Sequence, residues 1–159
     1  MAYTTIDDPE LFFQTKLYSG TGSAQSITLD GSEDMQPDWV WIKRRAPGNA
    51  NSGIMDSVRG ATKLISSQAG DVEQTLSTEL TSFDSDGFSV GNGSNGYVNQ
   101  NGSKTYVAWC WKAGTSFSNS AGANGADLAS TGSYNRTAGF SIVTFTGNAT
   151  ANQQIYHGL

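Results

Sequence analysis

The chain has 159 residues, about the length of one average domain, and 66 of them are Gly, Ser, Thr or Asn. Only 14% of the residues are charged and the net charge is −5, which argues against binding of nucleic acid. No apolar run approaches the ~20 residues of a membrane-spanning helix, so membrane insertion is not expected. With one cysteine and one histidine, the chain cannot form an internal disulfide and has little material for a histidine-based site. The composition predicts a small, loop-rich all-β protein.

The N-terminal segment carries a helix-start signal. Asp8 is a typical N-cap, Pro9 suits the first helical position, and Glu10 places an acid in the first turn. We predict one helical turn there and a strand over residues 13–18. The preceding residues show neither a basic nor an apolar stretch, so no secretory signal is expected.

Residues 1–16 are interpreted as an arm that anchors the chain to a neighbouring subunit. The alternative is a strand start that packs on the chain's own core. The residues predicted to form the anchor are Ile6, Asp8, Pro9, Leu11, Phe12 and Phe13.

Short strands separated by turn residues follow along the chain. They are predicted over residues 26–29, 38–43, 53–60, 81–84, 88–90 and 105–113. Ser85-Asp86-Gly87 indicates a tight hairpin between two of them. In the strand over 105–113, Val107, Trp109 and Trp111 share one face, and the alternate residues share the other. The pattern predicts an antiparallel β-sandwich over residues 17–113.

Residues 70–80 are the one helix candidate after the first turn. Val72, Leu76 and Leu80 recur at helical spacing, whereas several Ser and Thr residues weaken the pattern. A helix and an irregular loop are equally good interpretations of this segment.

The composition changes after the sandwich. Residues 114–138 are rich in Gly, Ser, Ala and Asn and are interpreted as a linker or as extra strands. Residues 139–159 are interpreted either as final strands or as the start of a second repeat. A faint repeat supports the second interpretation, because Tyr18-Ser19-Gly20 followed by Ile27 resembles Phe145-Thr146-Gly147 followed by Ile155.

No catalytic constellation emerges from the residues with chemical potential. The carboxylates lie mostly near turns, where acids serve solubility and turn geometry, so we expect neither enzymatic activity nor a cofactor. Asp84-Ser85-Asp86-Gly87 resembles part of a calcium loop, but it lacks the further acids of an EF-hand, and a hairpin is the stronger interpretation. We predict that Cys110 is buried rather than reactive. Four tryptophans either fill a core or form a platform for sugars: Trp39, Trp41, Trp109 and Trp111.

Five sequence blocks, taken in order, resemble a domain repeated in large virion proteins of tailed bacteriophages, notably those of marine cyanobacteria. The blocks are Ile6–Pro9 with Phe13–Thr15, Pro37–Lys43, Asp56–Ala61, Leu80–Phe88 and Tyr106–Gly114. The segment Ala138–Val143 is similar to the beginning of a further copy. This resemblance implies a concanavalin-like or jelly-roll β-sandwich in a tail fibre or another tail-associated structural protein. It implies no catalytic residue and no ligand set.

The resemblance leads to two expectations about function. The first is a structural component of the virion tail, in which the N-terminal arm attaches a tail fibre to the tube, an adaptor or the baseplate. Such a protein is expected to form a homotrimer or ring and to take part in host adsorption. The second is a lectin-like module that recognises host-surface polysaccharide, with polar groups supplied by the loops around Asn92–Asn101.

Overall fold

The computed structural model describes residues 6–48 and 50–159 and confirms the predicted all-β antiparallel sandwich. The chain divides into two compact units at the Lys112–Ala113 junction. We call Asp8–Lys112 the sandwich unit and Ala113–Leu159 the C-terminal unit, and describe each by itself. No helix in the described part of the chain is long and apolar enough to cross a membrane.

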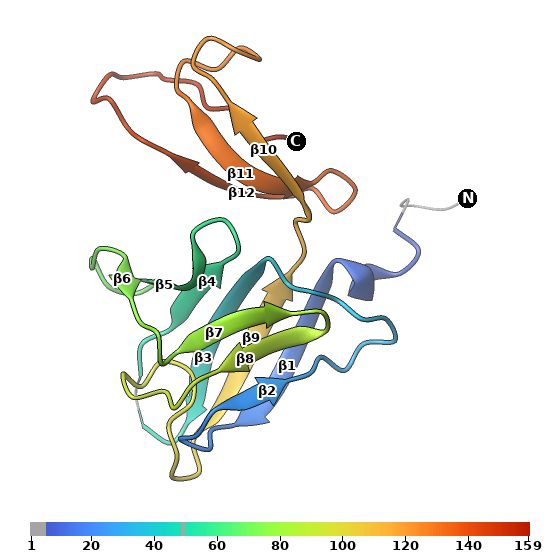
Figure 1. Ribbon diagram of the computed structural model, residues 1–159, viewed down its shortest axis with the longest axis vertical. Coiled ribbons are helices and arrows are strands. Elements are labelled where there is room, and N and C mark those ends of the chain that lie inside the picture. Colours follow the sequence, from blue (N-terminus) through green and yellow to red (C-terminus); the bar gives the residue numbers. More distant parts are fainter. Residues whose placement is uncertain (1–5, 49) are drawn as a thin grey trace. The chain divides into compact units, whose positions relative to one another are not determined.

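The sandwich unit contains two antiparallel sheets (Figure 1). The larger sheet has six strands in the order β1-β9-β3-β4-β5-β6, and the smaller has three in the order β2-β8-β7. Figure 1 shows the smaller sheet lying across one face of the larger one. The strands are β1 (Phe13–Ser19), β2 (Gln25–Ile27), β3 (Trp39–Ala46), β4 (Gly53–Asp56), β5 (Gly60–Ser66), β6 (Gln74–Thr75), β7 (Leu80–Asp84), β8 (Gly87–Val90) and β9 (Thr105–Trp111).

Alternation along the strands creates the core between these sheets. In β9, Tyr106, Ala108 and Cys110 are buried while the residues between them are half-buried. The sequence pattern predicted these two faces but not which of them is buried. Strand β3 alternates in the same way, with Val40 and Ile42 on its buried face. Phe88 of the smaller sheet joins them in one continuous buried cluster. The predicted burial of Cys110 is confirmed.

The helix interpretation of residues 70–80 is wrong, and the loop interpretation is correct. The segment contains the two-residue strand β6, loop and turn residues, and Leu80, the first residue of β7. Val72 is 83% exposed whereas Leu80 is fully buried in the core, so the apolar residues share no common buried face. A helix requires such a face to gain stability from tertiary packing. The predicted hairpin at Ser85-Asp86-Gly87 is confirmed by the pairing of β7 with β8.

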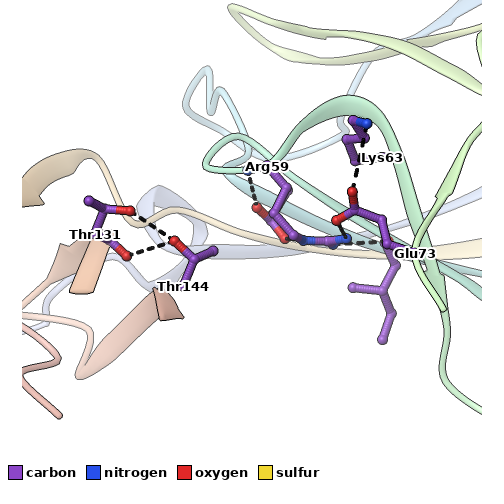
Figure 2. Close-up of polar contacts among 7 residues, drawn as sticks. Arg59, Lys63, Glu73, Thr131 and Thr144 are labelled. Atoms are coloured by element: carbon purple, nitrogen blue, oxygen red, sulfur yellow. Dashed lines mark hydrogen bonds and ion pairs between the residues drawn. The ribbon is translucent and has the colours of Figure 1, made fainter. Parts of the chain in front are cut away.

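The C-terminal unit contains one antiparallel sheet in the order β10-β11-β12. Its strands are β10 (Thr115–Asn119), β11 (Ser130–Asn135) and β12 (Phe140–Phe145). The Phe117 ring contacts Tyr134 and Tyr156, with ring centroids 6.0 and 5.3 Å away. Thr131 and Thr144 are hydrogen-bonded through their hydroxyl groups across β11 and β12 (Figure 2). Two strands therefore form within the small-residue stretch 114–138.

The two halves of the faint repeat pair differently. Ile27 lies opposite Phe88 in an antiparallel ladder of the sandwich unit. Ile155 instead forms an isolated parallel bridge with Leu128 in the C-terminal unit.

Candidate functional site

The N-terminal segment is folded onto the sandwich unit. Pro9–Leu11 form a 3-10 turn whose N-cap is Asp8, and the Asp8 carboxylate accepts a hydrogen bond from Glu10 N at 2.9 Å. Glu10 in turn accepts hydrogen bonds from the backbone N–H and hydroxyl of Ser32, at 2.7 and 2.9 Å. The predicted helical turn, with its cap and its proline, is therefore confirmed. These contacts fix the orientation of the segment.

The six predicted anchor residues occupy different environments. Phe13 begins β1 and packs on Trp111, with ring centroids 4.7 Å apart. Phe12 is half-buried and its carbonyl accepts the Lys112 backbone N–H. Leu11 is 38% exposed on the 3-10 turn, and Ile6 lies outside the sandwich unit. Residues 13–16 form the first half of β1. They are therefore part of the sheet and do not belong to a separate arm.

The tryptophans lie on the outer face of the six-stranded sheet rather than in its core. All four are half-buried, which contradicts the interpretation that they fill the core. Strand register places Thr15, Trp109 and Trp41 side by side, and Ile54 and Ile65 continue the row across β4 and β5. The Trp41 and Trp109 rings are in contact, with centroids 5.2 Å apart. We call these five residues the tryptophan row.

A polar hollow lies among the loops of the sandwich unit. Its volume is about 500 Å³. Side chains that can donate or accept hydrogen bonds line it together with three glycines: Gly22, Asn92, Gly93, Ser94, Gln100, Asn101, Gly102 and Lys104. We call this the loop hollow. Asn92, Ser94 and Asn101 are exposed and therefore accessible to a ligand.

A second hollow of about 290 Å³ shares Gln100 with the first. Arg44 and Asn95 line it, and the Arg44 guanidinium donates a hydrogen bond from Nη1 to Gln100 Oε1 at 2.8 Å. Gln100 therefore lines both polar hollows, and its side chain is oriented by the Arg44 guanidinium.

Buried Asn99 holds the loops that surround the loop hollow. Its Oδ1 accepts hydrogen bonds from Thr21 N and Gln25 Nε2, at 2.9 and 2.7 Å. Its Nδ2 donates to the carbonyls of Ser23 and Gly91. One fully buried amide therefore joins the β1–β2 loop to the β8–β9 loop.

Buried Glu79 performs a similar role for the β8–β9 loop. Its carboxylate accepts hydrogen bonds from the backbone N–H groups of Asn95 and Val98, at 2.9 and 3.0 Å. Burial raises the pKa of Glu79, although these N–H groups act in the opposite direction. We conclude that Glu79 orders backbone in this loop.

An ionic cluster at the β4–β5 turn is structural (Figure 2). Arg59 Nε donates to the buried Asp56 carboxylate at 2.6 Å, and its Nη1 lies 3.2 Å from Glu73. Lys63 Nζ lies 3.7 Å from the other oxygen of Glu73. Each carboxylate is thus matched to a cation. A buried charge that lacks its partner is strongly destabilising, so the cluster fixes the turn.

The remaining candidates for chemistry have structural partners. Asp84 accepts hydrogen bonds from the hydroxyls of Ser82 and Ser89, and Asp86 accepts the Met35 backbone N–H. Within residues 6–48 and 50–159, no three His, Cys, Asp or Glu residues gather as they would around a metal ion. Burial raises the pKa of the Cys110 thiol to about 12, so its nucleophilic thiolate form is disfavoured.

Sequence reasoning identified the loops around Asn92–Asn101 as polar, but it missed the roles of Asn99 and Glu79. Asn99 is one of many Asn residues in Gly/Ser-rich loops, and nothing in its local sequence distinguishes it. Asn99 and Thr21 are far apart in the sequence and come into contact only in the folded chain.

Comparison with known proteins yields one finding about ancestry. The family described as "Domain of unknown function (DUF7483)" matches residues 8–159. Neither the curated proteins nor the solved structures include a significant match.

Proposed function

The chain belongs to the DUF7483 family, whose function is unknown. We propose that the chain is a non-catalytic structural component of a phage virion tail. It attaches to a neighbouring tail protein through its N-terminal segment and takes part in host adsorption as a homotrimer or ring. The resemblance of its sequence blocks to repeated domains of tail fibres supports this proposal. The family match also supports treating residues 8–159 as one evolutionary unit.

The observation that carries the proposal is the rigid presentation of Leu11. A capped 3-10 turn and the Glu10–Ser32 hydrogen bonds hold the backbone on either side of it. The Leu11 side chain is nevertheless 38% exposed. An apolar side chain on a fixed backbone loses less conformational entropy on binding than one on a mobile segment, which suits an attachment point.

The test uses single substitutions in the full chain, because a deletion of residues 1–16 removes half of β1. Leu11→Asp places a charge in the proposed interface. Leu17→Asp is the matched control, since Leu17 is 60% exposed on β1. Binding to tails purified from the encoding phage is measured by co-sedimentation, with circular dichroism to verify folding.

We expect Leu11→Asp to weaken tail binding at least about tenfold, because burying an unpaired charge costs more than 1.4 kcal/mol. Leu17→Asp should bind like the wild type. Wild-type binding by Leu11→Asp, or equal loss by both variants, contradicts attachment through the N-terminal segment.

A second candidate function is recognition of host-surface glycan. The tryptophan row and the loop hollow favour it, because sugars are bound by aromatic faces together with polar groups that fix orientation. The Trp41 and Trp109 rings are only half-buried, so part of each remains accessible to a ligand. The two functions are compatible in one virion protein.

A further inference from the structure

The loop hollow is lined by hydrogen-bonding side chains, by one cation and by the backbone of three glycines. Asn92, Ser94 and Asn101 supply exposed amide and hydroxyl groups, and Lys104 supplies the charge. Of the described residues that line either hollow, none is a carboxylate. We infer that the loop hollow binds an anionic saccharide, with Lys104 contacting its carboxylate or sulfate group. This inference rests on the second candidate function and names its site and its ligand class.

The charge distribution around the hollow favours an anion. Residues 17–29, 43–55 and 91–104, which include the surrounding loops, contain four cations and no acid. The chain as a whole has a net charge of −5, so the charge of this region is opposite in sign to that of the whole chain. Arg44 adds positive charge beside Gln100 and orients its amide through Oε1. The amide nitrogen of Gln100 then remains to donate to a ligand oxygen.

The hollow is shaped before any ligand arrives. Asn99 ties the β1–β2 loop to the β8–β9 loop, and Glu79 orders the backbone near Asn95. Gly93 has a φ of 63°, and a Cβ there would lie 2.6 Å from the Asn99 backbone. The close backbone approach therefore requires glycine at this position. A site with fixed loops loses less entropy on binding, which favours small polar ligands.

Several features favour a saccharide over nucleic acid. Sugars present adjacent hydroxyl groups that amide side chains can bind as both donors and acceptors. Single-stranded nucleic acid requires exposed aromatic rings for base stacking and several cations for its phosphates. Tyr97 is the aromatic residue among the described lining of the two hollows, and it is buried. Amides thus dominate the accessible lining.

The test measures binding of short oligosaccharides to the full chain by isothermal titration calorimetry. The probes are a uronic-acid tetrasaccharide, a sulfated tetrasaccharide, neutral maltotetraose and a four-nucleotide oligothymidylate. Lys104→Gln removes the proposed charge contact. Lys112→Gln is the matched control, because it removes the same charge outside the loop hollow. Thermal melting verifies that both variants are folded.

We expect at least one anionic tetrasaccharide to bind about tenfold more tightly than maltotetraose, and Lys104→Gln to remove about that factor, since a charge-assisted hydrogen bond is lost. Lys112→Gln should change the affinity less than about twofold. Anionic binding that is unaffected by Lys104→Gln overturns the site while leaving glycan recognition intact. Preference for maltotetraose or for the oligonucleotide overturns the ligand class. Absence of saccharide binding overturns both the inference and the second candidate function, whereas tail attachment is decided separately.

Discussion

The sandwich unit and the C-terminal unit are both antiparallel β structures, but different interactions stabilise them. Fifteen buried apolar residues form a continuous core in the sandwich unit. In the C-terminal unit the buried apolar residues are Ala113, Ala126 and Ile142, and its rings form a cluster around Phe117. Buried polar residues such as Asn119 and Ser130 occupy much of its interior. A large core can support shaped loops with buried polar groups, and only the sandwich unit has one.

The largest loss of stability should come from removing a buried aromatic ring of the core. Phe88→Ala leaves a cavity at a fully buried position and should lower the free energy of unfolding by about 4 kcal/mol. Phe145→Ala in the C-terminal unit should change it by less than about 0.5 kcal/mol, because Phe145 is 53% exposed. Urea denaturation measures both. A similar loss in the free energy of unfolding for both variants would contradict the difference in packing between the two units.

The next effect compares two buried asparagines. Asn99→Ala deprives two loops of four hydrogen bonds and should lower the free energy of unfolding by about 3 kcal/mol. Asn119→Ala in the C-terminal unit removes bonds to nearby Ser120, Ala123 and Asn124 and should lower it by about 1 kcal/mol. Denaturant titration again provides the measurement. A larger loss for Asn119→Ala would contradict the special role of Asn99 in the loops.

A smaller, pH-dependent effect is expected at Glu79. Burial raises its pKa above the ordinary value of 4.5, so the folded state holds the proton more tightly than the unfolded state. The stabilisation from this proton is present below pH 4.5 and is lost as the pH rises through the folded-state pKa. The stability advantage of the wild type over Glu79→Gln should therefore decrease from pH 4 toward pH 7. Thermal melts at several pH values measure this difference, and an advantage that grows with pH would contradict a raised pKa.

The smallest expected effect concerns Cys110, whose thiol should be unreactive in the folded chain. Its pKa of about 12 and its burial predict negligible reaction with a thiol-specific reagent at pH 8. Reaction should become complete once denaturant unfolds the sandwich unit. Fast modification of the native chain would mean that the core opens far more readily than its packing indicates.

Local sequence signals predicted most of the sandwich unit. Asp8 and Pro9 mark the 3-10 turn, and the alternation in β9 separates its two faces. The segment over residues 70–80 was ambiguous because Val72, Leu76 and Leu80 fit a helix by spacing alone. Tertiary packing decided the outcome, since Leu80 is buried in the core and Leu76 packs against it, whereas Val72 is exposed.

The candidate site was less predictable than the fold. The Gly- and Asn-rich loop over residues 91–104 indicated polar groups, but the partners of Asn99 lie as far away as Thr21 in sequence. The tryptophans were interpreted as either core or platform residues, and only the packing of the folded chain shows which face of β9 is buried. Such long-range pairings are not encoded in any local pattern.

The most direct test of the proposed function is mass spectrometry of virions purified from infected cells that express the chain. We expect peptides spanning residues 8–159 in the virion, at an amount that matches a tail component and enriched in isolated tails. Abundant chain in the soluble lysate, together with its absence from purified virions, would contradict a structural role in the tail.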